Sequence, residues 1–194
     1  MSKSIVTISK FMSKYLRHEP EALGLNLEAG GWVLITDLLD GAERHGFPIT
    51  KAELLQVVAE NDKQRFALDN SETKVRANQG HSTSVDLQLN EVEPPPHLYH
   101  GTVSKFLDVI LIEGLKKMNR HDVHLSKEIG TAAKVGERRG KPIILVVDSA
   151  KMAADGYKFR LSENGVWLTG HVPPKYIRLM EGNATDHAAL THSD

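Results

Sequence analysis

The distribution of apolar residues predicts a helix near the start of the chain. Apolar positions recur there at intervals of three or four residues, as on one face of an α-helix. They are Ile5, Ile8, Met12, Tyr15 and Leu16. The helix must end before Pro20, because the residue that precedes a proline avoids the α region. Arg17 and His18 are therefore expected at its C-terminal end.

A turn and two more helices are expected next. Gly30-Gly31 predicts a turn into Trp32-Val33, and an apolar helical pattern resumes over residues 35–39. Thr50 is followed three residues later by Glu53, which makes a capping box. This pair predicts the start of a helix.

A β-hairpin closes this part of the pattern. Segments 65–68 and 73–76 flank Asp69-Asn70-Ser71, a sequence suited to a turn between two strands. Helices followed by such a hairpin suggest a small winged-helix domain.

Beyond Pro94-Pro95-Pro96 the pattern changes to short apolar runs that alternate with helical ones. The aliphatic run at 142–147 is typical of a buried strand. Asn164-Gly165 predicts a tight hairpin turn that leads into Val166-Trp167-Leu168. This half is therefore expected to be α+β. Further strands are expected at 97–100 and 123–125, and helices at 104–115 and 129–139.

The triple proline is the clearest boundary, because it can neither continue a helix nor donate ladder hydrogen bonds. It divides the chain into residues 1–93 and residues 97–180. From residue 181 onward the chain is rich in Ala, Asp, His and Thr without periodicity, which predicts a disordered tail over 181–194.

Composition narrows the possible chemistry. The chain of 194 residues contains no cysteine, which excludes disulfides, thiol nucleophiles and thiolate zinc sites. No apolar run is long enough to span a membrane, and the first residues lack the apolar core of a signal peptide, so a soluble cytoplasmic protein is expected. His121 and His124 alone lack the further ligands of a stable zinc site, and no metal is expected.

Charge is divided unevenly along the chain. Residues 1–93 carry 10 Lys and Arg against 14 Asp and Glu, a net of −4, and residues 94–194 carry 14 against 11, a net of +3. A net charge of −1 for the whole chain argues against a broad basic face that coats nucleic acid. Any RNA site would therefore be a focused cluster of arginines.

Single candidate residues are weak signals. Arg17 and His18 have an ordinary explanation, since cations near a helix C-terminus complement the helix dipole. Arg65 fits an exposed strand edge, and Arg120 fits a solvated loop. Arg138, Arg139 and Lys141 are interpreted as a solvated helix end, with contact to RNA or to a pyrophosphate as the alternative.

Several short motifs are informative because they occur together in a fixed order. Together they resemble the tRNA/RNA 2′-phosphotransferase family over about residues 8–180. They are Tyr15-Leu16-Arg17-His18, Lys63-Gln64-Arg65-Phe66, Arg76-Ala77-Asn78-Gln79-Gly80-His81-Ser82, Tyr99-His100-Gly101-Thr102, Arg120-His121-Asp122-Val123-His124-Leu125-Ser126 and Glu163-Asn164-Gly165-Val166-Trp167-Leu168-Thr169.

The resemblance implies a fold and a set of site residues. It implies an α+β protein with a winged-helix lobe over 1–93 that binds the RNA 2′-phosphate. An ADP-ribosyltransferase-like lobe over 97–180 would bind NAD⁺, with the active site in the cleft between the lobes. The implied catalytic residues are Arg17, His18, Arg65 and Arg120. The implied NAD⁺ contacts are His100, Gly101, Thr102, His124, Ser126 and Val166. RNA contacts are expected from Arg76, Asn78, Gln79 and His81.

The resemblance also implies a two-step reaction. The RNA 2′-phosphate attacks the nicotinamide ribose of NAD⁺ and expels nicotinamide, and the ribose 2″-hydroxyl then attacks the phosphorus. The products are 2′-OH RNA and ADP-ribose 1″,2″-cyclic phosphate. Relatives that modify proteins often have a glutamate at the position that matches Val166 of this chain, and a carboxylate there would repel a phosphate acceptor.

The expected partners are RNA with an internal 2′-phosphate, as in a spliced tRNA, and NAD⁺ as a consumed co-substrate. A monomer without membrane association is expected. Two other functions stay open. One is an ADP-ribosyltransferase that acts on nucleic-acid terminal phosphates or on protein, and the other is an NAD⁺-sensing winged-helix protein that binds nucleic acid.

Overall fold

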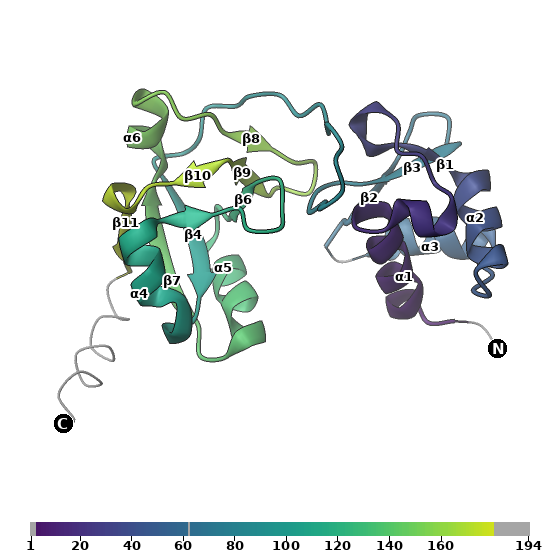
Figure 1. Ribbon diagram of the computed structural model, residues 1–194, viewed down its shortest axis with the longest axis horizontal. Coiled ribbons are helices and arrows are strands. Elements are labelled where there is room, and N and C mark those ends of the chain that lie inside the picture. Colours follow the sequence, from purple (N-terminus) through teal and green to yellow (C-terminus); the bar gives the residue numbers. More distant parts are fainter. Residues whose placement is uncertain (1–2, 62, 181–194) are drawn as a thin grey trace. The chain divides into compact units, whose positions relative to one another are not determined.

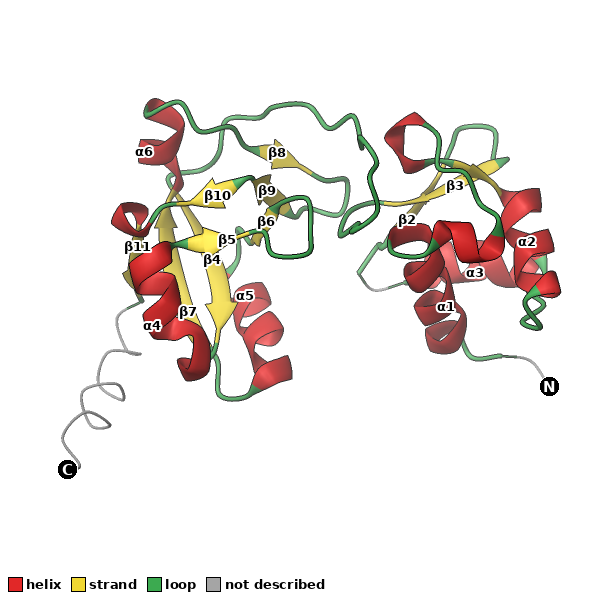
Figure 2. Ribbon diagram, viewed as in Figure 1, coloured by secondary structure: helices red, strands yellow, loops and turns green. Residues whose placement is uncertain are grey.

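The computed structural model describes residues 3–61 and 63–180. The chain forms two compact units, Met1–Leu89 and Asn90–Asp194 (Figure 1). Figure 2 shows that each unit mixes helices with short strands, which confirms the α+β class. The predicted tail at 181–194 lies outside the described residues.

The first unit combines helices with a small antiparallel sheet. Strands β1, β3 and β2 pair in that order, with Val33 and Leu68 both opposite Val75. This confirms the predicted hairpin, but the pairing of β1 with it was not predicted. The elements are α1 (Ile5–Arg17), β1 (Val33–Leu34), α2 (Ile35–Arg44), α3 (Lys51–Glu60), β2 (Phe66–Leu68) and β3 (Lys74–Ala77), with 3-10 turns at Pro20–Leu23 and Ala29–Gly31.

Local sequence explains where these elements begin and end. The side chain of Ser4 accepts a hydrogen bond from Thr7 N and caps α1. The predicted capping box of Thr50 and Glu53 is present at the start of α3. Gly30 and Gly31 have φ of 80° and 77°, the left-handed region that glycine adopts without strain.

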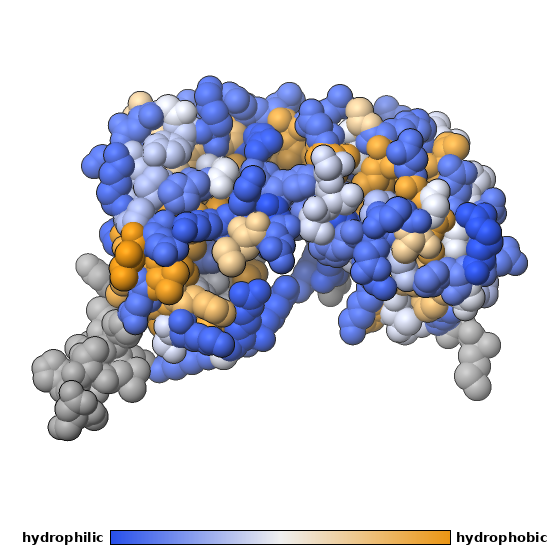
Figure 3. Space-filling model, in the orientation of Figure 1, coloured by the Kyte–Doolittle hydropathy of each residue, from blue (hydrophilic) through white to orange (hydrophobic). Residues whose placement is uncertain are grey.

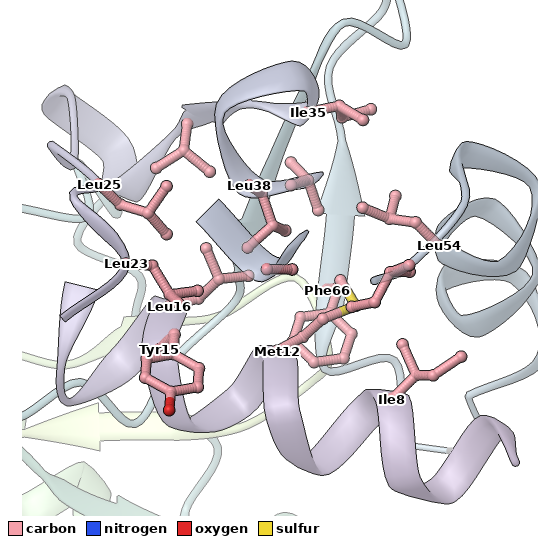
Figure 4. Close-up of a cluster of buried hydrophobic side chains, with 14 of the residues drawn as sticks. Ile8, Met12, Tyr15, Leu16, Leu23, Leu25, Ile35, Leu38, Leu54 and Phe66 are labelled. Atoms are coloured by element: carbon pink, nitrogen blue, oxygen red, sulfur yellow. The ribbon is translucent and has the colours of Figure 1, made fainter. Parts of the chain in front are cut away.

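The core of the first unit fixes the position of α1. Met12 and Leu16 of α1 are fully buried and lie in one cluster with Leu38 of α2, Leu54 of α3 and Phe66 of β2 (Figure 4). Burying one such side chain contributes about 1.5–3 kcal/mol. Because this face of α1 is buried in the core, Arg17 and His18 at the end of the helix have fixed backbone positions.

The second unit consists of antiparallel sheets covered by short helices. The strand orders are β11-β7-β4, β6-β9-β8 and β10-β5. Its elements are β4 (His97–Thr102), α4 (Ser104–Glu113), β5 (Leu115–Lys116), β6 (Val123–Leu125), α5 (Ile129–Gly136), β7 (Ile143–Asp148), α6 (Ser149–Ala154), β8 (Arg160–Leu161), β9 (Trp167–Thr169), β10 (His171–Val172) and β11 (Ile177–Leu179), with 3-10 turns at Glu137–Arg139 and Pro174–Tyr176.

The predicted buried strand is β7, the central strand of its sheet. The helix predicted at 104–115 was too long at its end. Gly114 has φ of 82° and stops α4, and Leu115 instead pairs with Val172. The helix predicted at 129–139 remains α-helical to Gly136 and then tightens into a 3-10 turn.

The triple proline packs on the second unit. Pro94 is buried, the carbonyl of Pro95 accepts a hydrogen bond from Ser149 Oγ at 2.6 Å, and that of Pro96 accepts one from Ala150 N at 3.2 Å. The prolines therefore belong to the second unit, and the division between the units falls at Leu89, before them.

Apolar side chains are exposed on α4. Figure 3 shows hydrophobic colour gathered over this helix, where Phe106, Val109 and Ile112 are exposed. No helix within residues 3–61 and 63–180 is both long enough and apolar enough to cross a bilayer.

Candidate active site

The first unit brings together three of the predicted catalytic residues. Arg17 is the last residue of α1, His18 caps that helix, and Arg65 stands just before β2. Arg17 Nη2 donates to the carbonyl of Arg65 at 3.4 Å. Side chains of all three line a surface hollow of about 570 Å³.

This hollow is rich in cations. Lys10, Lys14 and Lys63 line it beside the two arginines, against the acidic Glu60. Lys14 also makes an ion pair with Glu19 at 3.1 Å. The surplus of positive charge suits an anionic ligand.

The loop after β3 holds the end of α1. Backbone N–H groups of Ser82 and Thr83 donate to the carbonyl of Arg17 at 2.9 and 3.2 Å, so they satisfy a carbonyl that the helix leaves without an internal partner. Ser82 Oγ lies 2.8 Å from His18 Nδ1 and orients the imidazole. Ser82 belongs to the Arg76–Ser82 motif, but nothing local in that motif predicts this role.

The side chains predicted to contact RNA are largely engaged within the first unit. Asn78 and His81 are only 5% and 1% exposed. Asn78 Nδ2 donates to the carbonyl of Gln64 at 2.7 Å. Arg76 stacks over the Trp32 ring at 4.5 Å. Asn78 and His81 support the fold, whereas Arg76 and Gln79 are partly exposed.

The second unit brings His100, Arg120 and His124 together. His100 lies on β4 and His124 on β6, and these strands are joined where Tyr99 and Ser126 exchange backbone hydrogen bonds at 2.8 Å. His100 Nδ1 lies 3.1 Å from the carbonyl of His124. Arg120 Nη1 lies 3.2 Å from His124 Nδ1.

These contacts define the protonation of both rings. A carbonyl only accepts, so His100 Nδ1 carries the proton and donates it to His124 O. An arginine only donates, so Nδ1 of His124 carries no proton and accepts from Arg120. Burial lowers the pKa of His100, and the charges of Arg120 and Arg139 lower it further, against the His124 hydrogen bond, which raises it. A neutral His100 therefore presents Nε2 as an acceptor.

Like charge surrounds Arg120. Its pKa is lowered by partial burial and by the charges of Arg139 and Arg138, although it stays protonated at neutral pH. The neighbouring Arg160, by contrast, is neutralised by Asp122 at 2.6 Å. An anion beside Arg120 would relieve this repulsion.

The remaining predicted NAD⁺ contacts lie on or next to the same strands. Thr102 ends β4 and is 7% exposed, and Val166 closes the turn before β9, where its N–H donates to Ser162 Oγ at 3.1 Å. Gly101 has a packing explanation, since a Cβ there would lie 1.8 Å from the carbonyl oxygen of Ala132 on α5. Because Gly101 has no side chain, α5 can pack directly against β4.

Within the part of the chain that the structure describes, no group of three or more His, Asp or Glu side chains could hold a metal ion.

The cationic side chains gathered in each unit suit phosphate-like anions. The family model described as "RNA 2′-phosphotransferase, Tpt1 / KptA family" matches residues 3–171. A "Probable RNA 2′-phosphotransferase" of Streptomyces coelicolor is 56% identical over 173 residues, which cover 89% of this chain and 94% of that protein. One of the same description from Trichormus variabilis is 57% identical over 175 residues, 90% of this chain and 96% of that protein. The chain belongs to the RNA 2′-phosphotransferase family.

Proposed function

We propose that the protein removes an internal 2′-phosphate from RNA and consumes NAD⁺ in doing so. The observation that carries the proposal is the match to the family over residues 3–171, which includes the clusters of both units. The proposal assigns a winged-helix fold to the first unit and an ADP-ribosyltransferase-like fold to the second.

In the first step a 2′-phosphate oxygen attacks C1″ of the nicotinamide ribose, and the bond from C1″ to nicotinamide breaks. A phosphate monoester carries about −1.5 to −2 charges near neutral pH, so this nucleophile needs positioning more than deprotonation. The paired N–H donors of Arg17 and Arg65 suit that task, because a guanidinium binds phosphate in a fixed, bidentate geometry. His18, oriented by Ser82, donates to the phosphate or to a ribose hydroxyl.

In the second step the 2″-hydroxyl attacks phosphorus, and the bond from phosphorus to the RNA 2′-oxygen breaks. The hydroxyl loses its proton, and the RNA oxygen gains one. Negative charge builds on the non-bridging oxygens, and Arg65 with Arg120 stabilises it. The products are 2′-OH RNA and ADP-ribose 1″,2″-cyclic phosphate.

The tautomer of His100 supports a contact with NAD⁺. Its Nε2 accepts a hydrogen bond, and ribose hydroxyls are donors. Thr102, His124 and Ser126 complete this side of the proposed NAD⁺ site. The positive charge around Arg120 favours the pyrophosphate and the incoming phosphate alike.

The test uses a short RNA with one internal 2′-phosphate and NAD⁺. Nicotinamide release and RNA mobility are followed together, with the matching 2′-OH RNA and an NAD⁺-free reaction as controls. We expect one nicotinamide for each phosphate removed, and no release with the 2′-OH RNA. A stable ADP-ribosylated RNA would instead identify an ADP-ribosyltransferase. Binding without nicotinamide release would identify an NAD⁺ sensor.

A further inference from the structure

We propose that Asn61 is a positioning residue that holds the Arg65 guanidinium and ties it to α1, the helix that carries Arg17 and His18. This inference rests on the proposed function, in which Arg65 contacts the phosphate. Asn61 lines the same hollow as Arg17, His18 and Arg65, and the proposal gives it a role through Arg65.

Both ends of the Asn61 amide are engaged. Asn61 follows α3 and is 7% exposed. Its Nδ2 donates to Ser9 Oγ at 2.8 Å, and Ser9 is a buried residue of α1. Its Oδ1 accepts from Arg65 Nη1 at 3.1 Å and from Lys63 N at 3.2 Å. One buried amide therefore connects α1 to the guanidinium.

The backbone of Gln64 and Arg65 is braced as well. Gln64 N donates to the carbonyl of Asn61 at 2.8 Å, and Gln64 adopts φ of 41°, which is uncommon for a residue with a side chain. Asn78 secures the other side of the loop, through Nδ2 to the carbonyl of Gln64 at 2.7 Å and through N to the carbonyl of Arg65 at 2.9 Å. These contacts hold Arg65 in one place before a ligand arrives, which reduces the ordering cost of binding.

A neutral amide suits this position better than a carboxylate. Arg65 carries several N–H donors, and an amide oxygen engages one of them without cancelling the positive charge. A carboxylate would accept the same hydrogen bonds but would form an ion pair and repel an incoming phosphate. Asn61 therefore holds the arginine without adding a negative charge beside it.

The decisive experiment is a double-mutant cycle with Asn61→Ala, Arg65→Ala and the double variant. Single-turnover reactions with the 2′-phosphate RNA and NAD⁺ give separate rates for nicotinamide release and for loss of the phosphate. We expect Asn61→Ala to slow the second step about tenfold, as expected for loss of a hydrogen bond to a charged group. The double variant should be no slower than Arg65→Ala, because Asn61 acts through Arg65. Additive losses would overturn the positioning role.

Charge is tested separately with Asn61→Asp. Aspartate accepts from Arg65 and Lys63 as asparagine does, and the Ser9 hydroxyl can donate to its second oxygen in place of the Nδ2 bond, so a purely structural role predicts near-normal rates. The positioning role predicts slower phosphate removal and a raised KM for the RNA, with an unchanged melting temperature. Wild-type rates for this variant would contradict the argument from charge.

Matched controls separate local from general damage. Asn70→Ala removes an exposed asparagine in the hairpin turn and should leave both rates unchanged. If Asn61→Ala fails to fold, Ser9→Ala takes its place in the cycle. Ser9→Ala should slow the second step several-fold. This slowing should be absent when Arg65→Ala is also present. If Arg65→Ala is as active as the wild type, the proposed role of Arg65 is wrong. If only Arg65→Ala is impaired, the positioning role alone is wrong.

Discussion

The two units hold their cations in different ways. In the first unit Arg17, Arg65 and His18 make hydrogen bonds to neutral groups, namely the Arg65 carbonyl, the Asn61 amide and the Ser82 hydroxyl. In the second unit Arg120 lies among like charges, and burial lowers the pKa of both Arg120 and His100. Hydrogen bonds in the first unit therefore fix the positions of its charged side chains. In the second unit, burial and nearby charge instead control the protonation of side chains such as His100.

This difference has a physical consequence. Hydrogen bonds from neutral groups fix geometry at little electrostatic cost, so the first cluster is ready for a phosphate. Arg138 and Arg139 place like charge near Arg120, so an anion bound beside Arg120 should stabilise the second unit. Substitutions that disturb packing, charge or protonation in one unit should therefore have different effects on stability and on the reaction rates.

The largest expected effect is Gly101→Ala, which tests packing in the second unit. The new Cβ would meet the Ala132 carbonyl at 1.8 Å, so we expect a loss of several kcal/mol of unfolding free energy. The chain has two tryptophans, Trp32 in the first unit and Trp167 in the second. Urea unfolding followed by fluorescence, with each tryptophan in turn replaced by phenylalanine, should place the loss in the second unit.

Gly130→Ala is the matched control for this packing effect. Gly130 lies in α5, and a Cβ there meets nothing within 4 Å. Alanine at that position should raise stability by up to about 1 kcal/mol. Equal stability for the two variants would show that packing on α5 does not explain Gly101.

The next effect concerns one arginine from each unit. Arg65→Ala and Arg120→Ala should each slow the second step about 100-fold or more, the usual cost of losing a donor to developing negative charge. ADP-ribosylated RNA should then accumulate, as seen by gel mobility. Nicotinamide release should fall less. Loss of nicotinamide release without any intermediate would contradict this division of labour.

A smaller effect is expected for Val166→Glu. Val166 is half-buried at the closing position of the β8–β9 turn, so a glutamate there should leave the fold intact. Its charge should repel the phosphate and slow turnover about tenfold. Val166→Gln, of similar size but neutral, is the control, and equal rates for the two variants would remove charge as the cause.

The comparison also explains what could be predicted from sequence. The helix of Arg17 follows from apolar spacing and Pro20, and the start of α3 follows from Thr50 and Glu53, because these signals are local. The end of α4 was wrong because the pairing of Leu115 with Val172 is a contact between distant segments. Local propensity carries no information about such a partner.

The same limit applies to the candidate site. Arg17, His18 and Arg65 were found through their motifs, and the structure brings them to one hollow. Asn61 and Ser82 were not assigned, although each stands in or next to a motif, because their roles depend on the partners Ser9 and His18. Burial likewise could not be read from the motif that contains Asn78 and His81, where polar residues suggested a surface.

The smallest expected effect is the pH dependence that His100 gives to the stability of the second unit. Its pKa in the folded protein is lowered from 6.5, so between those two values the unfolded chain binds a proton that the folded chain does not. The contribution to stability is therefore fully present above about pH 6.5 and is lost as pH falls through the lowered pKa. His100→Asn keeps an N–H near the His124 carbonyl but cannot titrate. Urea unfolding reported by Trp167, in steps from about pH 7.5 to 5, should fall less steeply for this variant than for the wild type. Parallel curves would mean that His100 is not held neutral, and the contrast between a unit that places charge and a unit that controls protonation would then rest on Arg120 alone.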